Sequence, residues 1–256
     1  MRRVITGRRE FGKLIAGTAG IVLAGGAARA ELTGAGKLSA FPWPYTPLDP
    51  EKIAVRGFEG YGKAHCMYGA FEALAGTTAE GLGEPYTSFP FGMFEYGAGG
   101  IQGWGTICGA LNGAAAAFKL LSKAPGPLTD ALFTWYERAA LPDMKLEKAK
   151  FPNVPSAAGS PLCHTSISRW CEAARKPSYS AERKERCGVI TGCVARRAVE
   201  LLNAQVAGKP FPVLPAGGSA TTCARCHEKG GEVENTRSKM DCKGCHFHLG
   251  GDHPKT

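Results

Sequence analysis

The sequence has few long apolar runs and almost no strand-like alternation. After residue 30 no stretch approaches the roughly 20 apolar residues of a membrane-spanning helix, so we expect no stable membrane insertion. No run of alternating β-branched residues is long enough for a sheet, which predicts a mainly α fold. A Gly-rich segment at residues 97–100 lacks the G-K-[ST] sequence and the strand–helix setting of a phosphate-binding loop, which argues against a nucleotide site.

The net charge is also small once residues 1–30 are left out. The 256-residue chain has 31 basic and 22 acidic residues, and residues 1–30 hold six of the basic ones and one of the acidic ones. The other 226 residues therefore carry a net charge of only +4. The high pI belongs mostly to the N-terminus, and we infer no nucleic-acid partner from it.

The first 30 residues have the pattern of a twin-arginine export signal. Paired arginines at positions 8 and 9 precede an aromatic residue, a lysine and a short Gly/Ala-rich apolar stretch, and Ala28-Arg29-Ala30 is an A-x-A cleavage pattern. We expect a periplasmic protein whose mature chain begins at Glu31, with an N-terminal membrane anchor as the alternative. This route exports folded proteins, and we therefore expect a cofactor inserted in the cytoplasm.

Two C-x-x-C-H motifs stand near the C-terminus, at residues 223–227 and 242–246. Two thiols one helical turn apart can add to the two vinyl groups of one haem, and the adjacent imidazole can ligate its iron. A lone motif is equally compatible with a redox dithiol or half of a zinc site, but two behind an export signal favour two c-type haems. The covalent attachment residues would be Cys223, Cys226, Cys242 and Cys245, and the proximal ligands His227 and His246.

The rest of the mature chain is predicted to be a helical, cysteine-rich domain at residues 31–208. A Pro/Gly-rich linker at 209–218 separates it from a small dihaem module at 219–256. A proline-rich segment at 38–50 is expected to be an extended arm, packed either on its own core or on a second subunit. Periodicity and composition predict helices at residues 63–75, 106–123, 128–141, 160–175 and 181–206.

Six cysteines remain outside the two haem motifs. Cys108 falls in the first turn of a predicted helix, where the helix dipole favours the thiolate form of a metal ligand. An iron–sulfur cluster, [2Fe–2S] or [4Fe–4S], takes four such ligands. The favoured candidates are Cys108, Cys163, Cys187 and Cys193, with Cys66 and Cys171 in reserve.

Three disulfides are the alternative that an exported chain permits. Cys163 and Cys171 are separated by about 12 Å of helical rise, and Cys187 and Cys193 by about 9 Å. Neither pair can form a bridge within its own helix. Disulfides between different helices remain open.

Several of these residues carry a resemblance to known proteins. The segment Cys108-Gly109-Ala110-Leu111-Asn112-Gly113-Ala114 and residues 193–202 resemble a bacterial family of redox-associated proteins named for its C…CGA…G…C…C pattern. With the export signal and the two haem motifs, nearly the whole mature chain is similar to the split-Soret cytochrome c family. That resemblance implies a homodimer with two closely stacked bis-histidine haems per subunit, one haem ligand from the other subunit, an iron–sulfur cluster in the helical domain, and periplasmic electron transfer.

Bis-histidine ligation would require two further histidines. His248 is the first choice because it lies two residues beyond a proximal ligand, and His253 and His164 are the other candidates. His65 and His164 each adjoin a cysteine, so either can instead lie beside the cluster. Each of the four is equally compatible with an ordinary surface histidine.

A dimer is also expected on physical grounds. The predicted haem module has only four large apolar residues, Val233, Met240, Phe247 and Leu249. Such a segment cannot bury two haems alone. The rings must be covered by each other, by the helical domain or by a second copy.

The sequence favours an electron carrier over an enzyme, because a haem iron with two histidine ligands has no open site. The alternative is a reductase with one open haem that acts on a small anion or peroxide, but no catalytic set stands near the haem motifs. A third hypothesis is that the helical domain is a docking module that binds a redox partner protein through residues 89–104.

Overall fold

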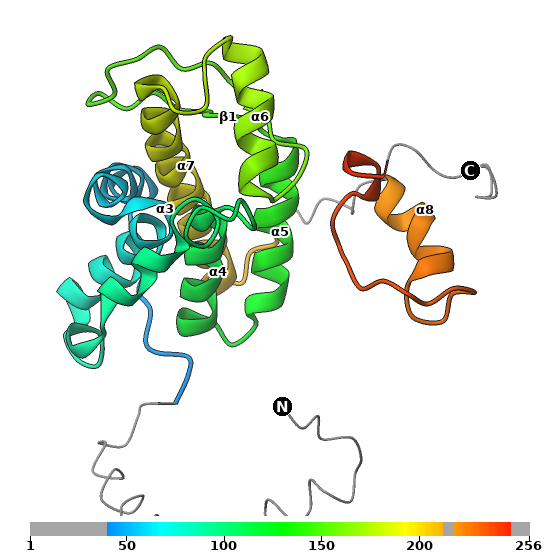
Figure 1. The fold of residues 1–256 in the computed structure, drawn as a ribbon. Helices are drawn as coiled ribbons and strands as arrows, with labels where there is room; N and C mark the ends of the chain where they lie inside the picture. Colours follow the sequence, from blue (N-terminus) through cyan, green and yellow to red (C-terminus); the bar gives the residue numbers. More distant parts are fainter. Residues whose placement is uncertain (1–39, 212–217, 247–256) are drawn as a thin grey trace, which may run out of the picture. The chain divides into compact units, whose positions relative to one another are not determined.

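The computed structural model describes residues 40–211 and 218–246. The predicted export signal, most of the predicted linker, and the candidate ligands His248 and His253 lie outside the described residues. Within them, the prediction of a mainly α fold is confirmed (Figure 1). The elements are α3 (Pro50–Leu82), η2 (Tyr86–Ser88), η3 (Phe91–Gly97), α4 (Gly109–Leu121), α5 (Pro125–Arg138), β1 (Ala140–Leu141), β2 (Ser156–Ala157), α6 (Cys163–Ala174), α7 (Ala181–Val206), α8 (Gly218–His227) and η4 (Cys242–Gly244).

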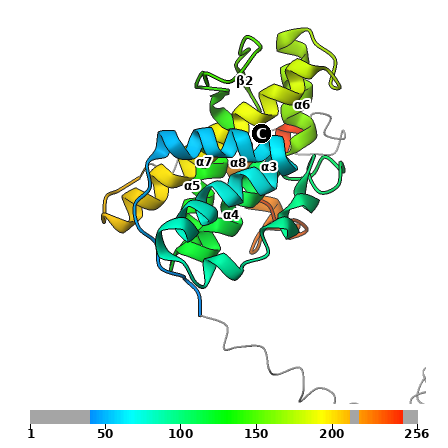
Figure 2. The ribbon, with the colours of Figure 1, turned by 90° about the vertical axis from the view of Figure 1, so that its left-hand side faces the viewer.

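Helix α7 is the centre of the helical domain. It packs against α3, α4 and α5, and Figure 2 shows α3 and α7 side by side. Val189, Val199 and Leu202 of α7 are fully buried in this core. Gly192 permits the close approach of the two long helices, because a Cβ there would lie 2.6 Å from the carbonyl oxygen of Ala54.

Helix α3 is two helical segments that meet at a break. Ala64 and His65 have non-helical backbone angles, and His65 has a left-handed φ of 68°. The second segment folds back on the first at two glycines, since a Cβ on Gly60 would lie 2.8 Å from the Cα of Gly69. The break leaves Cys66 as the first residue of the second segment.

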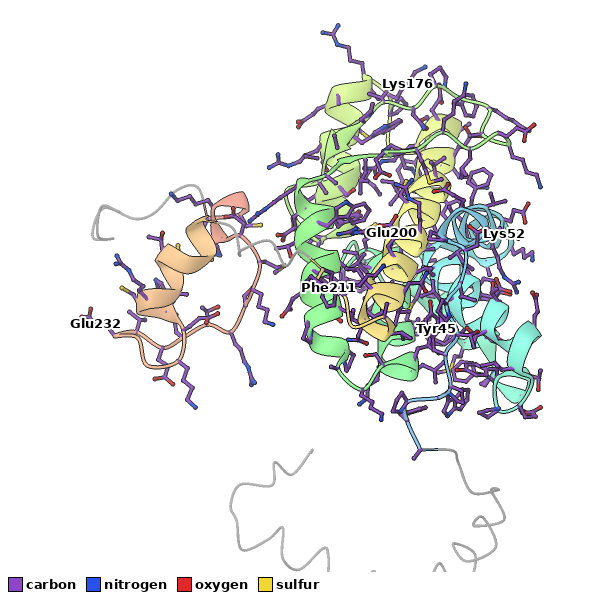
Figure 3. All side chains as sticks on the ribbon, turned by 180° about the vertical axis from the view of Figure 1, so that it is seen from behind. Tyr45, Lys52, Lys176, Glu200, Phe211 and Glu232 are labelled. Carbon is purple, nitrogen blue, oxygen red and sulfur yellow. The ribbon has the colours of Figure 1, made fainter. Side chains whose placement is uncertain are left out.

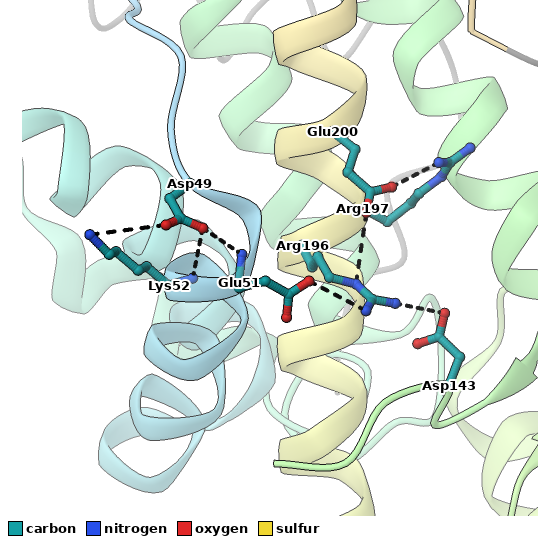
Figure 4. Close-up of polar contacts among 7 residues, drawn as sticks. All are labelled: Asp49, Glu51, Lys52, Asp143, Arg196, Arg197 and Glu200. Carbon is teal, nitrogen blue, oxygen red and sulfur yellow. Dashed lines mark hydrogen bonds and ion pairs between the residues drawn. The ribbon is translucent and has the colours of Figure 1, made fainter. Parts of the chain in front are cut away.

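The start of α3 differs from the sequence prediction, which placed the helix from residue 63 and the whole of 38–50 in an extended arm. The helix begins at Pro50, because Asp49 caps it by accepting a hydrogen bond from the backbone N–H of Glu51 at 3.0 Å. Proline is well suited to the first helical position, where its missing N–H has no partner to lose. Arg196 of α7 lies 3.8 Å from Glu51 at the start of α3, and this ion pair links the two helices (Figure 4). Arg196 also lies 2.8 Å from Asp143, in the loop after β1.

The extended segment before α3 packs on its own chain. The backbone N–H of Trp43 donates to the carbonyl of Leu120 at 2.8 Å, and the Trp43 side chain is buried. The Tyr45 hydroxyl donates to the side chain of Asn203 at 2.7 Å, near the C-terminal end of α7 (Figure 3). Of the two alternatives for this arm, the structure shows packing on the domain's own core.

Strand structure among the described residues is confined to the two-residue pair β1 and β2, which is antiparallel. Among the same residues, none of the helices combines the length and the apolar character that a membrane span requires.

Candidate functional site: a four-cysteine cavity and two adjoining C-x-x-C-H motifs

A cavity of about 300 Å³ lies within the helical domain. Four cysteines contribute to its wall: Cys66, Cys108, Cys163 and Cys187. They come from four different helices or helix starts, and 121 positions separate the first from the last. The tertiary fold therefore brings together thiols that are far apart in the chain.

Three of the four cysteines stand where a helix begins. Cys66 follows the break in α3, Cys108 is the N-cap residue of α4, and Cys163 is the first residue of α6. Cys187 is in the second turn of α7. Because unpaired backbone N–H groups at a helix start favour negative charge, the three helix starts reduce the cost of forming thiolates at this cavity.

A short bridge between two loops holds Cys108 beside Cys163. The N–H of Cys108 donates to the carbonyl of Pro161 at 2.8 Å, and the N–H of Cys163 donates to the carbonyl of Thr106 at 2.7 Å. These bonds fix the starts of α4 and α6 next to each other. The two thiols are thus positioned by the backbone.

A left-handed segment covers part of the cavity. Residues 99–103 all have positive φ, including the β-branched Ile101 at 58°. Ile101 is costly in this conformation, at roughly 1–2 kcal/mol, and such strain concentrates at functional sites. The segment places Gly99 and Gly103 on the cavity wall, and the Gly99 backbone lowers the pKa of Cys66 by hydrogen bonding.

The glycines of the Cys108-Gly109-Ala110 segment have a steric role. A Cβ on Gly109 would lie 2.4 Å from the Sγ of Cys66, and a Cβ on Gly113 would lie 2.3 Å from the carbonyl oxygen of Met67. Only glycine lets α4 approach the second segment of α3 this closely. The spacing of these glycines therefore sets the distance between Cys66 and Cys108.

The cavity disfavours free thiolates. Burial, together with the smaller effects of the neighbouring Cys108 and Cys187, raises the pKa of Cys66 to about 12. Burial also raises the pKa of Cys108, against the nearby Tyr136 side chain, which lowers it, and burial and the nearby cysteines raise the pKa of Cys163. Several thiolates can share this space only if a cation neutralises them.

Cys193 and Cys171 are not on the cavity wall. Cys193 is fully buried beside Asp143, and burial raises its pKa to about 12. It follows Cys187 by six residues, which is about 120° around an α-helix, so the two side chains leave α7 on different faces. The cavity therefore favours Cys66 over Cys193 as a ligand, and the break in α3 explains why the sequence pattern left Cys66 in reserve.

The four thiols surround a space and do not converge on one point. No three His, Cys, Asp or Glu side chains within residues 40–211 and 218–246 are arranged as a ready site for one ion. All ten cysteines belong to these ranges and all are free. The arrangement suits a polynuclear iron centre, in which four cysteines are shared among several irons.

Two histidines adjoin the cavity cysteines. His65 is on the wall and its ring meets that of Tyr61 edge-on at 6.0 Å. His164 is exposed, with its Nδ1 3.0 Å from the carbonyl oxygen of Gly105. The prediction that His164, His248 or His253 is a distal haem ligand stays a prediction.

The two C-x-x-C-H motifs adjoin each other. The first motif forms the end of α8, the second begins with η4, and these two elements are in contact. Cys226 and Cys245 are exposed, while Cys223 and Cys242 are half-buried. Burial and then the neighbouring Cys223 raise the pKa of Cys242, so one thiol of each motif lies beside the other.

Asn235 was not singled out from the sequence. Its side-chain oxygen lies 2.8 Å from the Nδ1 of His227 and accepts a hydrogen bond from it. A hydrogen bond at Nδ1 is the usual arrangement of a histidine that ligates a metal through Nε2. No sequence signal identifies Asn235, because it follows His227 by eight residues across an irregular loop.

The fold and the cavity define a helical, cysteine-rich redox protein. Residues 64–201 match the family described as "Putative redox-active protein (C_GCAxxG_C_C)". This range contains all six cysteines outside the haem motifs, including the four of the cavity.

The wider similarity covers almost the whole chain. The split-Soret cytochrome c of Desulfovibrio desulfuricans (strain ATCC 27774 / DSM 6949 / MB) is 37% identical over 265 residues, which is 94% of each chain. A solved structure described as "A novel iron centre in the split-Soret cytochrome c from Desulfovibrio desulfuricans ATCC 27774" matches with a TM-score of 0.76 and 39% identity, over 81% of this chain and 91% of that one. This chain belongs to the split-Soret cytochrome c family.

Proposed function

We propose that this protein is a periplasmic electron carrier with two covalently bound c-type haems and an iron–sulfur centre. The observation that carries the proposal is that one chain has both a four-cysteine cavity and two C-x-x-C-H motifs that lie next to each other. The solved relative is described as containing a novel iron centre, which supports an iron site here.

The residues of the C-terminal module fit haem attachment. The thiols of Cys226 and Cys245 are exposed, as addition to a haem vinyl group requires. The Nδ1 of His227 donates to Asn235, as in histidines that ligate a metal through Nε2, and His227 would be the proximal iron ligand. Cys223 and Cys242 lie together, so the two haems would be attached close to each other. Each haem iron would supply a one-electron couple.

The helical domain fits an iron–sulfur centre. Cys66, Cys108, Cys163 and Cys187 match the four ligands of a [2Fe–2S] or [4Fe–4S] cluster. Their raised pKa values mean that these thiols are neutral unless a cation is bound, and iron would provide that positive charge. The Gly99 backbone and the helix starts of α4 and α6 would stabilise the bound thiolates.

The proposal includes a homodimer. Within the described part of the haem module, Val233 is half exposed, and Met240 is the other large apolar side chain. These residues cannot cover two haems, and of the possible covers, which are the other haem, the helical domain and a second copy, the proposal takes the second copy to supply part of the surface. Light scattering should give twice the mass of one mature chain, and a monomeric mass at working concentration would remove the dimer from the proposal.

The proposed cofactor set is tested by comparing total iron with haem in anaerobically purified protein. Two haems and four or more irons per chain are expected, and two haems with two irons would contradict the iron–sulfur centre. Cys66→Ser should lose most of the non-haem iron while keeping both haems. Cys193→Ser is the matched control and should retain the iron, because Cys193 is outside the cavity.

A further inference from the structure

Arg186 is a buried cation on the wall of the four-cysteine cavity. It precedes Cys187 on α7 and is only 5% exposed. One of its terminal nitrogens donates to the hydroxyl of Ser166 at 3.0 Å, and that hydroxyl also accepts from Tyr136 at 2.9 Å. The guanidinium is therefore held in place by a buried polar network.

The charge of Arg186 has no partner of opposite sign among residues 40–211 and 218–246: no ion pair there includes it. Its Nε is also buried without a hydrogen-bond acceptor. Arg196 and Arg197 on the same helix each also have an Nε without a hydrogen-bond partner. Unlike Arg186, however, Arg196 has a carboxylate partner at 2.8 Å in Asp143, and Arg197 has one at 2.8 Å in Glu200. A buried cation without a counter-charge is strongly unfavourable.

The cavity supplies the missing charge. An iron centre held by four thiolates is anionic, and each electron added to it makes it more so. Arg183 and Lys184 also contribute to the wall, but both are more exposed than Arg186, and solvent screens their charges. Arg186 is thus the cation that a buried anion at this position would interact with most strongly.

We infer that Arg186 is the counter-charge and hydrogen-bond donor of the iron–sulfur centre, and that it raises the centre's reduction potential. This inference rests on the proposed function. A fixed positive charge stabilises the reduced, more negative form over the oxidised form. The free Nε–H is the donor available to a sulfur atom of the centre.

The test is a mediated redox titration of the non-haem iron signal by electron paramagnetic resonance, in the full-length holoprotein. In each step a reduced mediator gives one electron to the centre, and no bond breaks. The variants are Arg186→Gln, which removes the charge, Arg186→Lys, which keeps it, and Arg197→Gln, a matched loss of charge farther along α7. Total iron is measured first in all four proteins.

At the wild-type midpoint, Arg186→Gln should lower the ratio of reduced to oxidised centre by roughly tenfold, equivalent to about 59 mV for one electron. Arg186→Lys should change this ratio by less than about threefold, and Arg197→Gln should leave it unchanged. If Arg186→Gln fails to bind the iron while Arg186→Lys binds it, this result would also support a requirement for positive charge at position 186.

Two results would overturn the inference. One is an Arg186→Gln midpoint equal to that of Arg197→Gln. The other is loss of the iron from both Arg186 variants but not from Arg197→Gln, which would assign Arg186 a role in packing alone. Absence of non-haem iron from the wild-type protein is a different result, because it removes the proposed centre itself.

Discussion

At the residue scale, the hydrogen bond between His227 and Asn235 couples a side chain in the loop to the proposed haem iron. An acceptor at Nδ1 makes the imidazole a stronger donor to the metal and so stabilises ferric iron. Asn235→Leu should raise the midpoint potential of one haem by a few tens of millivolts, where about 59 mV is a tenfold change. Asn235→Asp, a stronger acceptor, should lower it. Potentiometric titration of the haem absorbance would show both shifts, and equal potentials in all three proteins would contradict the assignment.

Cys193 gives a pH-dependent contribution to stability. Burial raises its pKa from 9.0 to about 12 in the folded protein. The neutral thiol is thus favoured by folding, and its stabilisation is complete below pH 9 and is lost as the pH rises toward 12. At pH 10.5 the loss should reach about 2 kcal/mol, at 1.36 kcal/mol per pH unit.

Urea unfolding at pH 8 and pH 10.5 measures this loss. Cys193→Ala lacks the thiol, so its free energy of unfolding should fall by about 2 kcal/mol less than that of the wild type over this interval. An identical fall in both proteins would mean that Cys193 is not buried as the structure has it.

At the element scale, the contact between α4 and the second segment of α3 depends on Gly109. A Cβ there would meet the Sγ of Cys66 at 2.4 Å and the carbonyl of Gly97 at 2.5 Å. Gly109→Ala should destabilise the protein by about 1–3 kcal/mol, a typical cost of overpacking, and reduce the non-haem iron. Gly126→Ala in α5 is the control, because nothing lies within 4 Å of its added Cβ, and it should keep the iron. Iron analysis and urea unfolding of both variants test this prediction. A wild-type content of non-haem iron in Gly109→Ala would refute the steric role of Gly109.

The two segments of α3 are joined by a partly buried ion pair. Arg56 in the first segment donates to Glu72 in the second at 2.6 Å, and to the exposed Glu80 at 2.6 Å. Arg56→Met would leave the buried Glu72 carboxylate unpaired and should lower the free energy of unfolding by about 3 kcal/mol. Glu80→Gln should cost less than about 1 kcal/mol, since Glu80 is solvated. Denaturant titration of both variants would test this, and equal losses would show that Glu72 does not need Arg56.

At the scale of the whole molecule, carrier and reductase differ in whether a haem iron has an open site. If each haem iron has two histidine ligands, as the resemblance implies, carbon monoxide should leave the spectrum of the reduced protein unchanged. A clear shift would instead support the reductase. Replacing His248, His253 or His164 by Ala should allow carbon monoxide to bind only where the removed histidine is a distal ligand, so the same absorption measurement identifies the ligands.

Several elements were predictable because their signals are local. The bounds of α7 agree with the predicted range 181–206, since Ser180 caps its start through the N–H of Arg183 and the apolar pattern is continuous. The early start of α3 was missed because the proline-rich composition outweighed the cap formed by Asp49 ahead of Pro50. The break at Ala64 and His65 was missed because no proline or glycine occupies it.

The sequence by itself determined which residues are proposed to attach haem, since each C-x-x-C-H motif places two thiols and an imidazole within five consecutive residues. It also determined the helical class and the residues available for a second metal centre. Only the tertiary structure decided which four thiols share a cavity. Cys66 reaches it through the break in α3, and Cys193 does not because it leaves α7 on another face. The spacing within each C-x-x-C-H motif is local, whereas this cavity depends on how three helix starts and the second turn of α7 pack together.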